Sequence, residues 1–381
     1  MAFTIANARV ITPERIIHGG VEIDGGRIVR VFAGKAPEVG NIIDAQGDYL
    51  APGFVDIHVH GKYGAQFPAG TPEALNEATR FFGLHGTTAI VPTFGSNSTE
   101  AILKGVKNVR RAMEEGNDGA RVIGAHMEGC YMNPKCGGAQ NSAFLFPPKP
   151  ENYMPIIETG VVLRVSAAPE VDGVLDMARK LAPQGILMSV AHSDANYDDM
   201  MNALDAGFTH VTHIYNALSM LTSCYYYPAV GACETALLHD EFTVEAICDG
   251  RHVPPQLLRL MYKIKGSDLF HAVTDSVYAG AENGTRIEAA MPRKIENDVC
   301  VLADDSMFDG STATTDRLLR TLVFEANIPI CDAVKMVTLT PARQVKARDI
   351  GRIAAGMRAD LNLFGDDLQI KKTWIGGKEY Q

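Results

Sequence analysis

The sequence predicts an α/β fold: a (β/α)8 TIM-type barrel joined to a small discontinuous β-domain built from both termini. Between residues 51 and 347, short apolar runs rich in β-branched residues alternate with longer segments of helical periodicity. Such alternation is typical of a parallel sheet whose faces are covered by helices. There are eight runs, at 53–60, 87–93, 121–128, 161–169, 187–193, 209–215, 243–249 and 270–275. Eight units predict a closed barrel, in which chemistry lies at the carboxyl ends of the strands.

The two ends of the chain have the pattern of short strands joined by tight turns. Strand-like runs at 3–5, 9–11, 21–23 and 28–31 precede the barrel, and Asp24-Gly25-Gly26 is a hairpin signal. Residues 359–364 and 370–375 are strand-like at the other end. Neither end could bury a core alone. We therefore expect one β-domain formed by 1–50 and 348–381, with the barrel at 51–347.

The segments between the apolar runs have helical spacing, and the segment at 71–82 has a clear start signal. Thr71 precedes Pro72 there. A threonine cap followed by proline at the first helical position is typical of a helix N-terminus. This segment therefore predicts the helix that follows the first barrel strand.

Composition excludes several classes of protein. The chain has 381 residues, of which 46% are hydrophobic and 21% charged, and no run is long enough to cross a membrane. A net charge of -10 argues against nucleic acid or an anionic membrane surface as a partner. The seven cysteines are scattered, with no C-x-x-C pair. Without a signal-peptide pattern at the start, a cytoplasmic enzyme is expected.

His58 and His60 stand at the end of the first barrel strand. Residues two apart in a strand point to the same side, so both imidazoles leave one face together. Paired nitrogen donors suit a divalent metal such as zinc or ferrous iron. An isolated His-x-His pair also arises by chance in polar strand ends, so the rest of the chain decides between the two interpretations.

Four more reactive side chains fall at the ends of later strands. They are Glu128 on the third, His192 on the fifth, His213 on the sixth and Asp275 on the eighth. A carboxylate such as Glu128 can bind or bridge metals, and Asp275 is placed as a general base for metal-activated water. Either later histidine alone could equally be a core residue. Chance placement of all six at strand mouths is improbable, which favours a metal-dependent active site.

Six motifs together resemble the amidohydrolase superfamily, and more narrowly its N-acetylglucosamine-6-phosphate deacetylase family. They lie at 51–61, 126–129, 191–193, 212–217, 249–253 and 273–275. The resemblance covers nearly the whole chain. It implies that Glu128, His192 and His213 hold a principal metal and that His58 and His60 complete a second site. One or two divalent ions, zinc or iron, are the implied cofactors.

The resemblance also implies a reaction. Asp275 would take a proton from water and return it to the departing amine, giving an amino sugar phosphate and acetate. His252 would bind the substrate or its developing oxyanion. Independently of the resemblance, His126 stands two residues before Glu128 and points to the same interior face, where we expect a core group or a group that supports the ligands. The positions aligned with the family's substrate contacts are Ala139, Gln140, Asn216, Ala217, Arg251, His252, Phe308, Asp309 and Gly310.

Departures from the family pattern concern the phosphate. The family's arginine beyond the sixth-strand histidine is missing in 219–228, and Gln140 stands in place of a histidine. Arg251, Lys135, Lys62 or a residue of a partner chain could supply the charge. Asp309 at the expected pocket rim would disfavour phosphate.

Two alternatives to a sugar-phosphate deacetylase stay open. In one, the substrate is an unphosphorylated N-acyl amino sugar or N-acyl amino acid, and Tyr225, Tyr226 and Tyr227 stack on it. In the other, the barrel is a non-catalytic scaffold, which the retention of every candidate ligand disfavours. The family resemblance also implies a homodimer.

Overall fold

Parallel strands surrounded by helices form the larger part of the structure, a computed structural model that describes residues 2–35, 40–224, 226–288 and 291–380. Neighbouring strands pair in parallel around the ring, from β6 to β9, β11, β12, β13, β14, β17 and β18. Their bounds are β6 Phe54–Val59, β9 Thr87–Phe94, β11 Ala125–Glu128, β12 Val162–Ala167, β13 Leu187–Val190, β14 Phe208–Val211, β17 Thr243–Ile247 and β18 Phe270–Val273.

The last strand returns to the first. A parallel bridge joins Val59 to Ser276, and the Asp275 N–H donates to the His58 carbonyl at 2.9 Å. The ring is therefore nearly closed, and the predicted barrel is confirmed. One predicted strand is interrupted, because 121–128 forms β10 (Arg121–Val122) and then β11. A Cβ at Gly124 would lie 2.3 Å from the Leu163 side chain, so the chain passes too close to the next strand for a larger residue.

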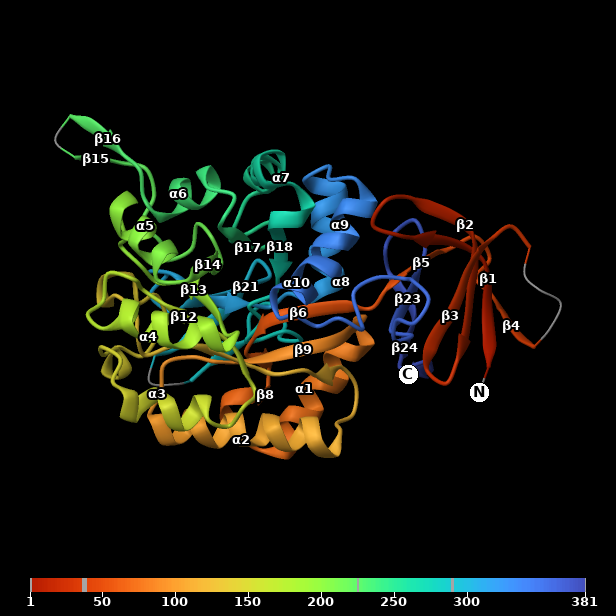
Figure 1. The fold of residues 1–381 in the computed structure, drawn as a ribbon, viewed down its shortest axis with the longest axis horizontal. Coiled ribbons are helices and arrows are strands. Elements are labelled where there is room, and N and C mark those ends of the chain that lie inside the picture. Colours follow the sequence, from red (N-terminus) through yellow and green to blue (C-terminus); the bar gives the residue numbers. More distant parts are fainter. Residues whose placement is uncertain (1, 36–39, 225, 289–290, 381) are drawn as a thin grey trace.

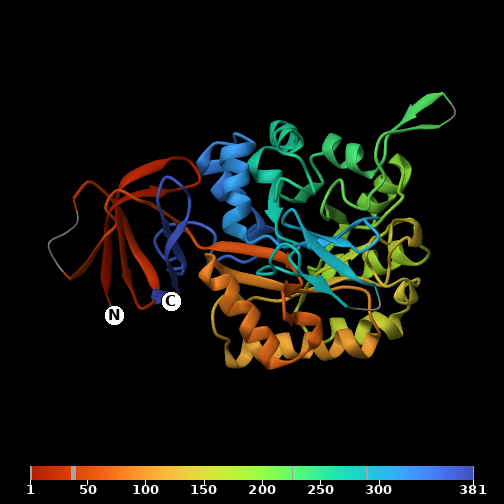
Figure 2. The ribbon, with the colours of Figure 1, turned by 180° about the vertical axis from the view of Figure 1, so that it is seen from behind.

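Helices cover the outside of the barrel (Figures 1 and 2). Thr71 Oγ1 accepts from the Ala74 N–H at 3.3 Å, which confirms the predicted cap of the first helix. The described helices are α1 Pro72–Leu84, α2 Thr99–Glu115, α3 Pro150–Ile157, α4 Val174–Leu181, α5 Tyr197–Asp205, α6 Ala232–Leu238, α7 Pro255–Leu269, α8 Thr315–Arg320, α9 Ile330–Met336 and α10 Leu339–Gln344. No helix in these ranges is long and apolar enough to cross a membrane.

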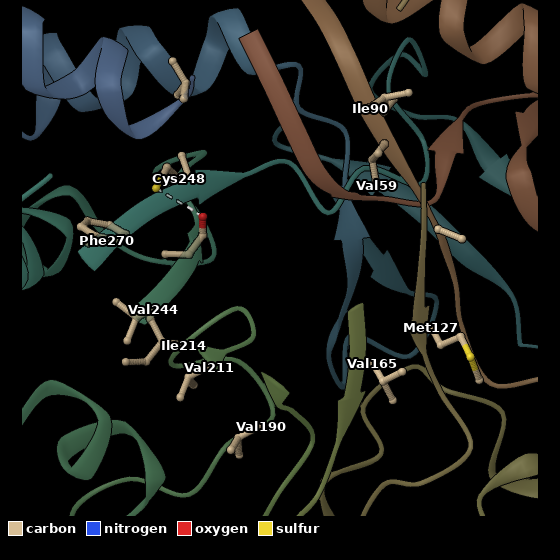
Figure 3. Close-up of a cluster of buried hydrophobic side chains, with 14 of the residues drawn as sticks. Val59, Ile90, Met127, Val165, Val190, Val211, Ile214, Val244, Cys248 and Phe270 are labelled. Carbon is tan, nitrogen blue, oxygen red and sulfur yellow. Dashed lines mark hydrogen bonds between the residues drawn. The ribbon is translucent and has the colours of Figure 1, made fainter. Parts of the chain in front are cut away.

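Apolar side chains of the barrel strands pack outward against these helices. One buried cluster contains strand residues such as Val59, Met127 and Val211 together with helix residues such as Phe82 and Val106. Figure 3 shows the strand members spaced around the ring. Because side chains alternate along a strand, the neighbours of these residues point into the barrel interior. The polar side chains of the barrel strands described below lie at these inward-facing positions.

Strands from both termini form one separate sheet at the end of the molecule (Figure 1). Its order is β25-β24-β23-β5-β1-β2-β3, and β4 pairs with β1. The strands are β1 Phe3–Ile11, β2 Ile16–Asp24, β3 Arg27–Ala33, β4 Asn41–Asp44, β5 Tyr49–Pro52, β23 Leu361–Phe364, β24 Ile370–Ile375 and β25 Lys378–Tyr380. The predicted β-domain built from both ends is therefore present. The exact boundaries at 50/51 and 347/348 stay a prediction.

Three smaller sheets interrupt the barrel connections, and the sequence pattern did not predict them. The strands β7 Gly61–Lys62 and β8 Ala65–Gln66 form a short pair, and β15 Thr222–Cys224 and β16 Tyr227–Ala229 form a hairpin that projects from the barrel (Figure 1). A four-stranded sheet follows the eighth barrel strand. It contains β19 Arg286–Ile287, β20 Arg293–Glu296, β21 Val299–Leu302 and β22 Phe308–Ser311.

Trp374 anchors the core of the terminal sheet, where it is 1% exposed among residues such as Val10, Leu50 and Leu361. We expect Trp374→Ala to lower the free energy of unfolding by about 3–5 kcal/mol, because truncation of a buried aromatic leaves a cavity. Val29→Ala on β3, at a side chain that is 55% exposed, is the matched control and should change it by less than about 0.5 kcal/mol. Urea unfolding followed by circular dichroism measures both; equal values would contradict a packed core in this sheet.

Candidate metal centre

The six predicted side chains meet at the carboxyl end of the barrel. His58 lies within β6, His60 directly follows it, and Glu128 is the last residue of β11. The other three stand two residues past the ends of β13, β14 and β18 rather than within strands: they are His192, His213 and Asp275.

These last three residues have left-handed backbones. Their φ angles are 46° at His192, 28° at His213 and 47° at Asp275. A residue other than glycine pays about 1–3 kcal/mol for such a conformation, which persists where the surroundings enforce it. The turn at the end of each strand directs the side chain across the barrel mouth. Sequence patterns predicted the positions of these residues but not this turn.

His58, His60, Glu128 and Asp275 form the first group. The His60 Nε2 atom lies 3.1 Å from Glu128 Oε2 and 3.1 Å from Asp275 Oδ1. The His58 Nε2 atom lies 3.3 Å from Glu128 Oε1 and 3.3 Å from Asp275 Oδ1. One ligand atom from each of the four residues therefore lies within 4.8 Å of the others.

Glu128 also belongs to a second group, with His192 and His213. Its Oε1 atom lies 2.9 Å from His213 Nε2 and 3.5 Å from His192 Nε2. The two Nε2 atoms are 3.2 Å apart. Glu128 thus faces ligand atoms of both groups, a geometry that suits either one cation or a pair bridged by this carboxylate.

Burial and the neighbouring charged or hydrogen-bonding groups shift the pKa values of these side chains in opposite directions. Burial lowers the pKa of His60, but hydrogen bonds with Asp275 and Glu128 outweigh it and raise that pKa to about 9. Burial raises the pKa of Glu128, while the charge of His58 and hydrogen bonds from His192 and His213 bring it well below its usual range. The pKa of Asp275 is likewise raised by burial and lowered overall by the charge of His58. Both carboxylates remain negative in buried surroundings, where such charges need cationic partners.

The donor set fits a divalent cation. The buried His58 Nε2 atom has no hydrogen-bond partner among the described residues and faces both carboxylates. In His58 and His192 the other ring nitrogen, Nδ1, is hydrogen-bonded to the protein. His58 Nδ1 lies 2.8 Å from Glu245 Oε1, and His192 Nδ1 lies 2.9 Å from the Cys136 carbonyl oxygen. Metal-binding histidines are commonly oriented in this way. Imidazole and carboxylate ligands suit zinc or iron.

His126 does not join either group. Its Nδ1 atom lies 3.2 Å from Thr93 Oγ1 and its Nε2 atom lies 2.7 Å from Ser166 Oγ, so both ring nitrogens are engaged in the core. Its edge packs against the His58 ring, with 4.7 Å between the ring centroids. This is the core position behind the ligands that the sequence predicted.

His252 is held by Asp249 and Phe308. Its Nδ1 atom lies 2.8 Å from Asp249 Oδ2, its backbone N–H donates to Asp249 Oδ1 at 2.9 Å, and its ring packs against Phe308. The buried Nε2 atom has no partner in the described ranges. Asp249 lies in the motif at 249–253, but the sequence assigned it no role, although its spacing of three residues from His252 was a usable signal.

A cavity of about 590 Å³ opens next to His252. Its lining residues are Gly250, Arg251, Glu296, Asn297, Val299, Val301, Asp305 and Phe308. The unpredicted four-stranded sheet supplies most of this lining, including the predicted substrate contact Phe308, and it lines the cavity together with the predicted contact Arg251.

The loop after β11 brings further predicted residues to the centre. Gln140 Oε1 accepts from the Ser96 N–H at 2.7 Å, and its Nε2 atom lies 3.4 Å from Glu128 Oε2. Gly138, one residue before Ala139, lies against the His192 ring and Ala217. On the loop that contains Ala217, the Asn216 side chain donates to the His213 carbonyl oxygen at 3.3 Å.

Asp309 is not a free acid at the rim. Its Oδ2 atom accepts from Arg293 Nε in a largely buried ion pair. Burial raises the pKa of Asp309 and the charge of Arg293 counteracts it. The expectation that Asp309 disfavours phosphate stays a prediction, and Arg293, a partner that the sequence does not reveal, offsets the charge on which it depends. Gly310 follows with a φ of 58°, and a Cβ there would lie 2.4 Å from Val277 Cγ2.

The three candidate phosphate-binding cations differ in their surroundings. Lys62 Nζ lies 2.7 Å from Glu77, and the exposed Lys135 lies 3.5 Å from Asp194. Within the described ranges, Arg251 has no carboxylate at ion-pairing distance. It is therefore the cation among the three that is open to a ligand.

The predicted stacking tyrosines lie on the projecting hairpin. Tyr226 is 94% and Tyr227 is 77% exposed, and Tyr225 lies outside the described residues. The hairpin extends away from the barrel in both views (Figures 1 and 2). Tyr226 and Tyr227 therefore do not cover the centre of their own chain.

Comparisons with known proteins show the family of this chain. The model of the amidohydrolase family matches residues 49–380. The N-acetylglucosamine-6-phosphate deacetylase of Vibrio furnissii is 31% identical over 334 residues, 86% of this chain and 82% of that protein. The N-acetylgalactosamine-6-phosphate deacetylase of Escherichia coli O157:H7 is 25% identical over 358 residues, 91% and 92% of the two chains.

A solved structure of the Mycobacterium smegmatis N-acetyl-D-glucosamine-6-phosphate deacetylase, a mutant in complex with N-acetyl-D-glucosamine-6-phosphate, has a TM-score of 0.90. It is 28% identical and covers 100% of this chain and 99% of its own. The barrel and its mouth define a hydrolytic enzyme that acts on amide bonds in a metal-dependent superfamily. The chain belongs to the amidohydrolase family.

Glu128 is the residue shared by both groups, so its charge should matter most for metal binding. We expect Glu128→Gln to lose most of its bound zinc or iron after dialysis, because an amide supplies no negative charge to offset a buried cation. Glu114→Gln, on the exposed surface of α2, should keep the metal content of the parent protein. Elemental analysis of the folded proteins measures this; an unchanged metal content in Glu128→Gln would contradict the shared-ligand geometry.

Proposed function

We propose that the protein hydrolyses N-acetylglucosamine 6-phosphate to glucosamine 6-phosphate and acetate. The observation that carries the proposal is the convergence of His60 Nε2 with Glu128 and Asp275, at 3.1 Å from each. Two relatives support this choice: the Vibrio furnissii protein, which is an N-acetylglucosamine-6-phosphate deacetylase, and the Mycobacterium smegmatis deacetylase, whose structure was solved in complex with N-acetyl-D-glucosamine-6-phosphate. An unphosphorylated N-acyl substrate is not favoured by these relatives.

Glu128, His192 and His213 would hold the principal ion, and His58 and His60 would complete a second site. Zinc and ferrous iron are the proposed metals, because both accept imidazole and carboxylate ligands. A bound divalent ion supplies Lewis acidity, which makes water easier to deprotonate and an amide carbonyl easier to attack.

Asp275 would carry the proton in this reaction. As an ionised carboxylate it accepts a proton from the attacking water, whose oxygen forms a bond to the acetyl carbon. When the bond from that carbon to nitrogen breaks, Asp275 returns the proton to the departing amine. The products are a free amino sugar phosphate and acetate, and Asp275 is again ionised.

His252 would orient the substrate. Because Nδ1 faces the Asp249 carboxylate, an uncharged ring donates from Nδ1 and presents a lone pair at Nε2. That atom accepts a hydrogen bond from a substrate O–H or N–H group. The contact with Asp249 is also compatible with a doubly protonated ring, which would donate from Nε2 to a developing oxyanion.

We also propose a homodimer, which the family resemblance implies. The projecting hairpin with its exposed Tyr226 and Tyr227 supports a contact outside the chain's own barrel. In such a dimer, a residue of a partner chain could add to the phosphate contacts made by Arg251.

We expect Asp275→Asn to lower kcat for acetate release by about 10²–10⁴-fold, since an amide cannot accept the proton. The variant should retain bound metal, because Glu128 and the histidines remain. Acetate release from N-acetylglucosamine 6-phosphate and metal content measure the two effects. Normal turnover by this variant would show that another group is the base.

We expect Arg251→Met to raise KM for N-acetylglucosamine 6-phosphate by about tenfold or more, since a charge-assisted hydrogen bond contributes about 1.5–3 kcal/mol. For unphosphorylated N-acetylglucosamine, KM should be unchanged. Steady-state kinetics on both substrates measures this, and N-acetylgalactosamine 6-phosphate in the same assay reports the choice of epimer. An equal loss on both glucosamine substrates would count against contact between Arg251 and phosphate.

A further inference from the structure

A fully buried carboxylate, Glu245 on β17, lies inside the barrel directly behind the candidate metal centre. Its exposed fraction is 0%, and so is that of Arg164 on β12, its ion-pair partner. Neither residue belongs to the sequence motifs described above. A buried charge of this kind needs hydrogen-bond partners for its polar atoms. The partners of the two Glu245 oxygens therefore indicate what this residue does.

The first contact orients His58. Glu245 Oε1 lies 2.8 Å from His58 Nδ1. An ionised carboxylate can only accept hydrogen bonds, so this contact places the ring proton on Nδ1. In the uncharged ring, which is the form that can bind a metal, the lone pair of His58 is then at Nε2, the atom that faces Glu128 and Asp275. Glu245 therefore selects the tautomer in which His58 can bind a metal.

The second contact holds the backbone of His213, a member of the other group. The His213 N–H donates to Glu245 Oε1 at 3.3 Å, and the Ile214 N–H donates to the Glu245 backbone carbonyl at 2.8 Å. These bonds fall where the φ angle of His213 is 28°. A strained conformation persists only where its surroundings enforce it. Glu245 supplies two of the bonds around this turn.

Arg164 fixes Glu245 in turn. Its Nη1 donates to Glu245 Oε2 at 2.5 Å and its Nη2 donates to Oε1 at 2.7 Å, a bidentate pair. Arg164 Nη2 also contacts Thr212 Oγ1 at 2.7 Å and Ser189 Oγ at 3.3 Å. The guanidinium thus donates to both oxygens of Glu245, as expected for an ionised carboxylate.

His210 and His271 approach the same carboxylate but do not make it a third metal site. Their Nε2 atoms lie 3.3 Å and 4.0 Å from Glu245 Oε2. That oxygen already accepts from the Arg164 guanidinium, whose positive charge would repel a cation. Glu245 is therefore a supporting group for the neighbouring ligands rather than a ligand itself.

We propose that Glu245 is a positioning residue that orients one histidine in each candidate metal group, His58 through its ring and His213 through its backbone, and that Arg164 holds it in place. This inference rests on the proposed metal-binding role of those histidines. It differs from a purely structural role because removal of the carboxylate should change how the folded protein binds metal.

The test compares Glu245→Gln with Ser189→Ala. Ser189 hydrogen-bonds to Arg164 and Thr212 in the same buried layer, and among the described residues it has no hydrogen bond to His58 or His213. Zinc affinity is measured by competition with a chelator, the cobalt(II) absorption spectrum reports coordination, and thermal unfolding of the metal-free proteins reports stability. We expect Glu245→Gln to bind zinc about 10–100-fold more weakly with an altered cobalt spectrum, as for other residues that support metal ligands. Ser189→Ala should keep both properties of the parent.

A double variant tests the inference if Glu245→Gln alone does not fold. Glu245→Gln leaves the Arg164 charge buried without its partner, which is strongly destabilising. The double variant Arg164→Met with Glu245→Gln removes both charges and should fold while showing the same loss of zinc affinity. Parent-like zinc affinity and cobalt spectrum in either folded variant would overturn the inference. Unfolding of both would also overturn it, because Glu245 would then support the fold itself. If the parent protein bound neither zinc nor cobalt, that result would contradict the proposed metal-dependent function, whatever the role of Glu245.

Discussion

The buried negative charge of Glu128 is the constraint on which the rest of the site depends. It is 2% exposed, and ligand atoms of four histidines from three regions of the barrel lie within 3.5 Å of its two oxygens. A buried carboxylate without cationic partners is costly. The barrel therefore has to bring donors to this position from strands far apart in sequence. A closed ring of parallel strands achieves this because every strand ends at the same rim.

Several features of this arrangement were predictable from the sequence because they are local and periodic. The alternation of apolar runs with helical segments predicted the barrel, and the spacing of His58 and His60 predicted a shared face. The strand ends located Glu128, and they located His192 and His213 to within two residues. Both terminal segments lacked enough apolar residues for separate cores, which predicted a common sheet.

Other features were not predictable because they depend on partners distant in sequence. The ion pair between Asp309 and Arg293 joins β22 to β20, the two strands on either side of β21, in a sheet with no clear periodic signal. Glu245 meets His58 across 187 positions of sequence. The left-handed turns at His192, His213 and Asp275 need the assembled barrel to enforce them.

The polar interior of the barrel links fold to chemistry. Outward-facing residues such as Val59 and Val211 pack against the helices, and their neighbours along each strand face inward. The inward positions carry a charged layer of Arg164 and Glu245 below the metal ligands. Stability of the barrel and orientation of the ligands thus depend on the same alternation of side chains.

Anomalous diffraction from crystals grown with zinc or iron tests the central claim most directly. Data collected above and below the metal absorption edge locate the ions without reference to activity. The account predicts one or two anomalous peaks at the barrel mouth, in contact with the Glu128 carboxylate and the surrounding imidazoles. A metal-saturated crystal with no peak beside Glu128, or with peaks only elsewhere on the chain, would contradict it.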